Sequence, residues 1–115
     1  MPIIEHTIAV YKIWQEYRVH FPTQSRYTLG NRTDNLFVDI LELLFVASYQ
    51  KGADKLPTLR RIILKVDTLK FMVRVVWELK ILDNTKYIII SEKLEDIGKM
   101  VGGWKKGLES KTPPS

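Results

Sequence analysis

The sequence contains no cysteine, and this absence removes several kinds of chemistry at once. Disulfide bridges, cysteine-ligated metal centres and thiol nucleophiles all require a thiol group. Histidine is nearly as scarce, because His6 and His20 are the two in the chain and no third ligand follows at a metal-binding spacing. We therefore expect surface or loop histidines, with no catalytic residues, no metal site and no cofactor.

Glycine and proline are also few, with 6 and 5 residues in a chain of 115. Together with 45% hydrophobic and 27% charged residues, this composition is typical of a globular, helix-rich protein. No apolar run approaches the ~18 residues that span a bilayer, and the N-terminus lacks a basic region followed by an apolar one. We expect one cytoplasmic domain that does not contact a membrane.

Acidic residues are fewer than basic ones, so the chain has a formal net charge of +5 and a pI near 9.5. A basic protein favours acidic partners such as nucleic acid or an anionic membrane surface. The same charge is equally compatible with a role in solubility alone. Composition by itself does not separate these interpretations.

The stretch from Leu56 to Asp83 has the most informative pattern. Apolar residues recur there at steps of three and four, which places them on one side of an α-helix. A second apolar set falls nearly opposite, so one neighbouring layer cannot cover both sides. The first set is Leu59, Ile62, Val66, Leu69, Val73 and Val76, and the second is Leu64, Phe71, Val75 and Leu82.

Similar periodicity predicts four helices, at residues 3–19, 25–51, 56–82 and 85–109. Short connections force sequential neighbours to run in opposite directions, so we expect an all-α, antiparallel up-down-up-down four-helix bundle over residues 1–110. Residues 111–115 are rich in proline and are predicted to be a disordered tail.

The helix at 25–51 is also apolar on two sides. If the outer residues of this helix and the next remain exposed, their patch exceeds what monomers usually tolerate, roughly a few hundred Å². The pattern therefore predicts self-association, into either a two-fold dimer or a closed ring-like homo-oligomer, and periodicity does not choose between the two. The predicted interface residues are Val38, Leu41, Phe45, Tyr49, Leu64, Phe71, Val75 and Leu82.

Basic residues are predicted to gather at the end of the bundle that joins the second and third helices. If copies pack side by side in one orientation, these charges line one rim and suit phosphate contacts. A merely polar end is the alternative. The residues predicted to bind nucleic acid are Lys51, Lys55, Arg60, Arg61, Lys105 and Lys106, followed by Lys65, Lys70 and Arg74; Lys111 lies near the same end, and Glu5, Asp54 and Glu109 oppose them.

Three glycines, Gly98, Gly102 and Gly103, fall inside the predicted last helix, where each costs about 1 kcal/mol relative to alanine. They indicate either close packing of a neighbouring backbone or local fraying. The chain has neither a dinucleotide-binding glycine motif nor a phosphate-binding loop, and its paired carboxylates have no histidine partners. An enzyme is therefore not expected, and a small ligand-binding bundle would need a buried polar cluster.

Several short motifs are familiar as a set: residues 11–14, Phe21-Pro22, Arg26-Tyr27-Thr28-Leu29-Gly30, Asp34-Asn35-Leu36, Lys70-Phe71, Trp77-Glu78-Leu79-Lys80 and Gly102-Gly103-Trp104. Together they resemble the accessory variability determinant (Avd) family of diversity-generating retroelements. The likeness covers nearly the whole chain. The four-helix proteins encoded in intervening sequences of bacterial 23S ribosomal RNA genes share the fold and are the alternative family.

The resemblance implies a four-helix bundle that assembles into a basic, barrel-like homopentamer. Members of the family bind the reverse transcriptase of the element and nucleic acid, RNA or DNA. They are required for mutagenic retrohoming, in which a template RNA is copied with errors at adenines into a variable gene. The family offers no catalytic residues to carry over, so the implied role is that of a scaffold.

Overall fold

The computed structural model describes residues 2–111. Within this range the chain is entirely helical, with four long helices and three short segments, so the predicted all-α class is confirmed. The elements are α1 (Pro2–Arg18), α2 (Thr23–Ser25), the π-helical η1 (Arg26–Gly30), α3 (Asn31–Tyr49), the 3₁₀-helical η2 (Gly52–Asp54), α4 (Lys55–Glu78) and α5 (Asn84–Lys111). Of the predicted tail, all but Lys111 lies outside the described residues.

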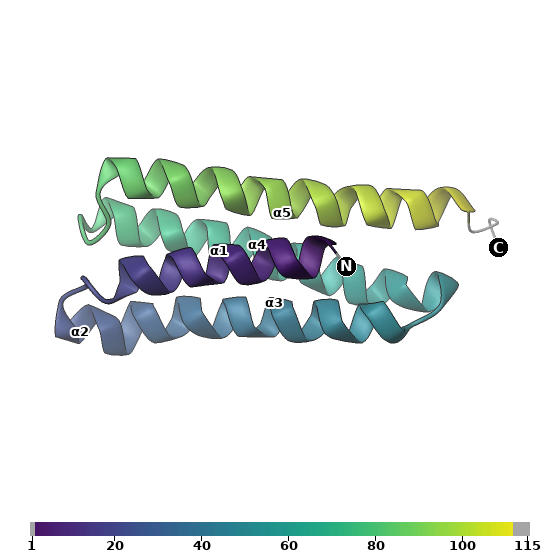
Figure 1. Cartoon of the computed structure of the whole chain (residues 1–115), viewed down its shortest axis with the longest axis horizontal. Helices are drawn as coiled ribbons and strands as arrows, with labels where there is room; N and C mark the ends of the chain where they lie inside the picture. Colours follow the sequence, from purple (N-terminus) through teal and green to yellow (C-terminus); the bar gives the residue numbers. More distant parts are fainter. Residues whose placement is uncertain (1, 112–115) are drawn as a thin grey trace.

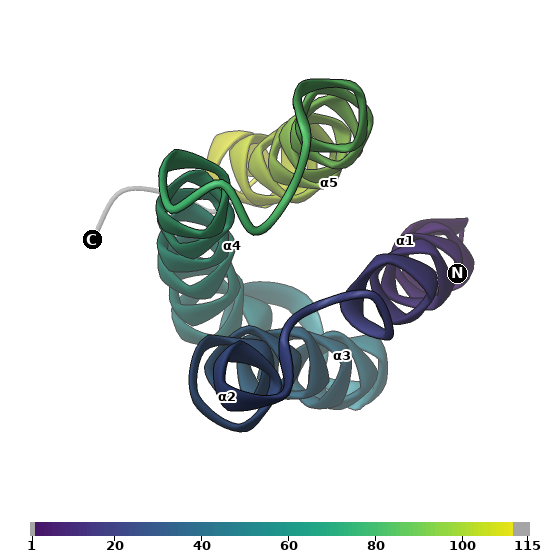
Figure 2. The same ribbon diagram turned by 90° about the vertical axis from the view of Figure 1, so that its left-hand side faces the viewer.

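The four long helices lie side by side in a rod of 51 × 23 × 21 Å. Figure 1 shows α1, α3, α4 and α5 running back and forth along the long axis, each in the direction opposite to the one before it. The end-on view in Figure 2 shows them around a common centre, with α1 beside both α3 and α5. The last turns of α5 continue past the N-terminal end of α1.

The core fills the centre of this arrangement with apolar side chains from all four long helices. Trp14 is fully buried and packs edge-on against Phe21 and at a tilt against Phe37. The first apolar set of α4, residues 59, 62, 66, 69, 73 and 76, is buried throughout, as its spacing predicts. This seam holds α4 against α3 on one side and α5 on the other.

The helical stretch before and including α3 contains a π turn that periodicity does not reveal. It begins at Thr23 and ends at Tyr49, whereas 25–51 was expected. The π turn coincides with the Arg-Tyr-Thr-Leu-Gly motif at residues 26–30. Gly30 leaves room there for Arg18, because a Cβ at this position would lie 3.0 Å from Nε of Arg18 and that side chain would have to shift. The Arg18 guanidinium donates to Oδ1 of Asn31 at 2.6 Å, which fixes the end of α1 on α3.

The predicted end of α4 at residue 82 is wrong, because the helix ends at Glu78. The N–H of Lys80 donates to the Trp77 carbonyl at 2.9 Å, and the N–H of Ile81 donates to the Val76 carbonyl at 3.1 Å. This pair of hydrogen bonds is the Schellman motif, which closes a helix with a left-handed residue. Lys80 takes that conformation at φ 63° although it is not glycine.

The other two connections follow the residues expected at them. Gly52 has a φ of 54°, in the left-handed region that glycine adopts most readily, between α3 and α4. The carboxylate of Asp83 accepts a hydrogen bond from the N–H of Lys86 at 2.8 Å and so caps the first turn of α5. The helices at 2–18 and 84–111 therefore match their predicted bounds within two residues.

Candidate nucleic-acid interface and self-association surface

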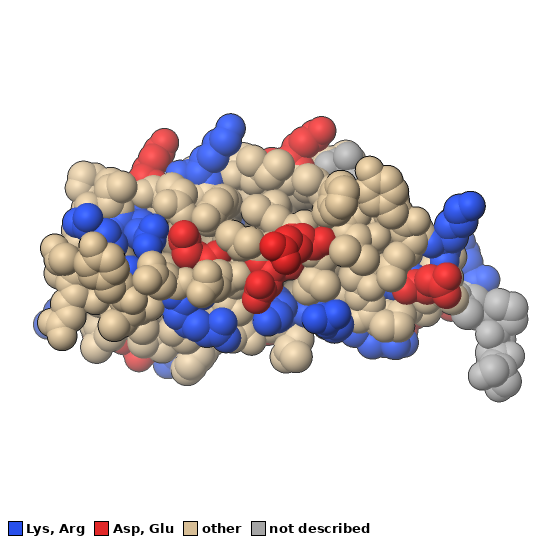
Figure 3. All heavy atoms as spheres, turned by 90° about the horizontal axis from the view of Figure 1, so that it is seen from below, with Lys and Arg blue, Asp and Glu red and all other residues tan. Residues whose placement is uncertain are grey.

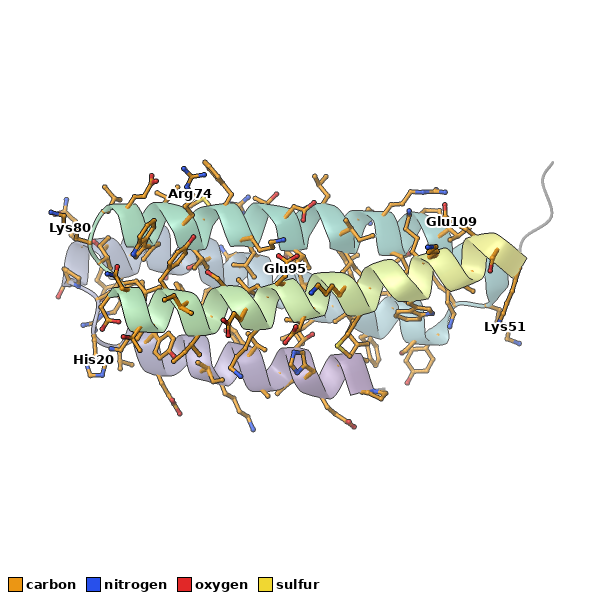
Figure 4. All side chains as sticks on the ribbon, turned by 90° about the horizontal axis from the view of Figure 1, so that it is seen from above. His20, Lys51, Arg74, Lys80, Glu95 and Glu109 are labelled. Atoms are coloured by element: carbon orange, nitrogen blue, oxygen red, sulfur yellow. The ribbon has the colours of Figure 1, made fainter. Side chains whose placement is uncertain are left out.

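One end of the rod collects basic residues from two separate parts of the chain. The connection from α3 to α4 and the last turns of α5 meet there, and Nζ of Lys55 lies 5.1 Å from the centre of the Trp104 ring. Figure 4 places Lys51 at this end together with Glu109, and Lys80 and His20 at the opposite one. We call Lys51, Lys55, Arg60, Arg61, Lys105 and Lys106 the basic end.

Besides the half-buried Lys55, four cations of the basic end have no carboxylate partner among the described residues. They are Lys51, Arg60, Arg61 and Lys106, and all four are exposed. Lys105 differs, because its Nζ lies 3.2 Å from Oε1 of Glu109 one turn further along α5. The unpaired four keep their full charge available to an anionic partner.

The second group of predicted cations is neutralised within the chain. Lys65 pairs with Asp39 of α3 at 3.1 Å, Lys70 with Glu95 of α5 at 2.7 Å, and Arg74 with Glu78 at 3.2 Å. Figure 3 shows basic side chains in a row along one long edge of the molecule, with acidic side chains beside them. The flanks of the bundle are thus closer to electrical balance than the basic end.

The outer face of α3 exposes an apolar surface. Phe45 is 58% exposed and Tyr49 is 74% exposed, and their rings meet edge to face with centres 4.9 Å apart. Val38 is exposed on the same helix and Leu41 is half-buried. An ordered aromatic pair of this kind on a surface is a common feature of protein interfaces.

The outer face of α4 adds a second apolar surface. Leu64 is 66% exposed and Phe71 is 59% exposed, while Val75 is half-buried. Leu82 does not belong to this surface, and its assignment to the interface is wrong, because it is 2% exposed. It follows the true end of α4 and folds back into the core, so the helical spacing that placed it outside does not apply.

Sequence reasoning missed several further exposed apolar residues, among them Ile8 on α1 and Val46 on α3. Ile8 lies outside the main apolar face of α1, and one apolar residue is too little to indicate a second face. Val46 directly follows Phe45 and lies between the inner and outer apolar faces of the helix, so the spacing of neither face included it.

The described residues bury few polar side chains. The buried polar side chains among them include Thr7 and Thr33, whose hydroxyl groups donate to backbone carbonyls one turn earlier. A hollow of about 620 Å³ opens on the surface at the turn between α4 and α5, where it is lined by Trp77, Glu78, Lys80, Leu82, Asp83 and Asn84.

No group of three or more histidine, aspartate and glutamate side chains within residues 2–111 is placed to hold a metal ion. None of the helices in this range is both long and apolar enough to cross a membrane.

Comparisons with known proteins agree with the motif set. No protein of curated function matches the sequence. A model of the bAvd-like family matches residues 4–108, which include nearly all of the four long helices and both faces described above. This match confirms the resemblance to the Avd family noted from the short motifs. The chain belongs to the bAvd-like family.

Proposed function

We propose that this protein is a non-catalytic accessory subunit of a diversity-generating retroelement. In this role it binds the reverse transcriptase and the template RNA in the cytoplasm and supports mutagenic retrohoming. The observation that carries the proposal is the family match over residues 4–108. The four unpaired cations at one end of the rod give the nucleic-acid part of the role a physical basis.

RNA binds the basic end, in this proposal, through its phosphates. Lysine and arginine side chains that contact phosphates release condensed counterions, so affinity falls as salt rises. Lys51, Arg60, Arg61 and Lys106 have no intramolecular partner to give up among the described residues, whereas Lys65, Lys70 and Arg74 must first leave a carboxylate. We therefore assign the primary phosphate contacts to the basic end and a secondary role to the paired cations.

Self-association is the second part of the proposal. The exposed apolar side chains of α3 and α4 bury against sister copies and form a homopentameric ring, the assembly that the family likeness implies. In a ring every subunit has the same orientation relative to the symmetry axis, so the basic ends lie on one rim. Their summed charge attracts RNA more strongly than a single subunit does.

The reverse transcriptase is assigned as a partner on family membership alone. A protein of the ribosomal-RNA intervening-sequence type would share the fold but act on a different RNA. The neighbouring genes separate the two roles: a reverse transcriptase gene beside a pair of near-identical repeats supports the retroelement role. Co-purification of the chain with that reverse transcriptase then tests the contact directly.

A salt titration of RNA binding tests the basic end. The double variant Arg60→Glu, Arg61→Glu removes two phosphate contacts, so the slope of log affinity against log salt should become shallower by roughly 1.4 to 1.8. Affinity at low salt should fall as well. The matched control is Arg32→Glu, Lys80→Glu, which makes the same change in net charge at two exposed residues: Arg32 lies in the first turn of α3, and Lys80 lies at the end of the rod opposite the basic end (Figure 4). Equal slopes for the wild type and the Arg60, Arg61 variant would reject the site.

A further inference from the structure

Trp104 occupies an unusual position on α5, past the part of the helix that α1 covers. Nζ of Lys86 on α5 lies 5.5 Å from the centre of the Tyr17 ring on α1, so these two residues are level with each other. The two helices run in opposite directions and rise equally per residue, which places Pro2 level with Val101. Trp104 therefore lies about one turn beyond the first described residue of α1.

The surroundings of Trp104 are open on the helix that carries it. Gly103 precedes it and Gly107 lies one turn further along, next to it on the helix surface. A Cβ added at Gly102, Gly103 or Gly107 would meet nothing within 4 Å. Close packing inside the subunit thus does not explain these glycines, and the helical assignment at all three positions argues against fraying. They place no side chain beside the ring of Trp104, which is half-buried and packs in part against the core.

Lys55 contacts Trp104 in a way that a ligand is able to replace. Its ammonium group lies over the ring at 5.1 Å from the centre, at the tip of a flexible side chain. A cation over an exposed ring favours that position by about 2- to 5-fold, whereas stacking of a nucleobase on an aromatic ring is worth about 5- to 100-fold in affinity. A base therefore displaces the ammonium, which is then free to contact a phosphate.

We propose that Trp104 is a stacking site for an unpaired nucleobase, so that the basic end selects single-stranded over double-stranded RNA. The inference rests on the proposed function, since it names how RNA is held at the end already assigned to it. A cation over a half-buried aromatic ring, at an end that carries further unpaired cations, is the combination that single-strand binding uses. In a duplex both faces of each base are already stacked, so Trp104 adds nothing to duplex affinity.

The test compares Trp104→Leu and Trp104→Phe with the wild type. Each is titrated by fluorescence anisotropy with an unstructured single-stranded RNA 12-mer and with a 12-base-pair RNA duplex. Leucine keeps the apolar contact with the core but lacks a stacking face, so single-strand affinity should fall about 5- to 100-fold. Duplex affinity and the salt slope should stay unchanged, because the phosphate contacts remain. Phenylalanine should retain most of the single-strand affinity.

The matched control is Trp77→Leu, the same substitution at a half-buried tryptophan that stacks on Tyr87 near the other end of α4. It should leave single-strand affinity unchanged. Equal single-strand affinity of Trp104→Leu and the wild type overturns the stacking site. The Arg60, Arg61 variant still tests the phosphate contacts of the basic end separately. An equal loss on single strand and duplex also overturns it. Absence of RNA binding by the wild type overturns both this site and the proposed function.

Discussion

Nζ of Lys70 on α4 lies 2.7 Å from Oε2 of Glu95 on α5. This contact ties two neighbouring helices together on the surface of the rod, where both side chains are partly exposed. The hydrogen bond from Lys70, followed by its positive charge, holds the pKa of the Glu95 carboxyl below its ordinary value. The same ion pair neutralises Lys70, which the sequence analysis predicted to bind nucleic acid.

Replacing Lys70 by methionine should raise the pKa of Glu95 toward its ordinary value, because the two largest causes of the lowered pKa are removed and the charge of Lys99 alone remains to lower it. A depressed carboxyl pKa contributes stability above the ordinary pKa, and this contribution is lost as the pH falls through the folded-state pKa. The variant should therefore show a weaker loss of stability in acid. NMR titration of the Glu95 carboxyl measures the pKa, and an unchanged value would contradict the role given to Lys70.

Replacing Phe45 by glutamate should break the oligomer into monomers. The change places a charge in the centre of the exposed aromatic pair, and burial of an unpaired charge at an interface costs several kcal/mol. Phe71→Glu tests the face of α4 in the same way. Sedimentation velocity measures the result, and Asn35→Glu, at an exposed polar position of α3, is the control. An oligomer that survives both phenylalanine changes would place the interface elsewhere.

Neutralising Asp39 as asparagine should raise RNA affinity about twofold to threefold at low salt, since it frees Lys65 from its partner at 3.1 Å. Glu16→Gln is the control, because it makes the same change in net charge at an exposed residue that forms no ion pair within residues 2–111. Filter binding or anisotropy measures both. An equal gain from the two variants would mean that net charge, rather than the release of Lys65, is responsible.

Lys80→Gly should stabilise the protein by about 0.5 to 1 kcal/mol. The left-handed conformation at φ 63° is unfavourable for a residue with a Cβ and is open to glycine, whose greater freedom in the unfolded chain offsets part of the gain. Lys80→Ala retains the Cβ and should give no such gain. Urea denaturation followed by circular dichroism compares the three proteins, and equal effects of glycine and alanine would exclude conformational strain as the cause.

Apolar spacing predicted the helices and the buried side of α4 because a helix repeats every 3.6 residues. Its failures have local causes. Lys80 occupies the place where glycine usually closes a Schellman motif, so the sequence carried no stop signal before Leu82. The π turn at Arg26–Gly30 packs against Arg18 of the preceding helix, and this contact between separate helices leaves no periodic trace in the sequence.

The candidate site, like the fold, was predictable only in part from the sequence. The sequence identified the basic residues and the two-sided apolar character of α3 and α4, because charge and spacing are properties of the chain itself. It did not identify which cations are free. Lys65 and Lys70 pair with carboxylates 26 and 25 residues away in the chain, and those partners become neighbours when the helices pack.

The sequence by itself determined the helical class, the seam of α4 and the family to which the chain belongs, since these follow from local periodicity and short motifs. The tertiary structure decided where α4 ends, which cations keep their charge for a partner, and that Trp104 lies beside Lys55 at an open end. The physical reason is that ion pairs, ring contacts and burial join residues from different helices, and their distances are set by packing.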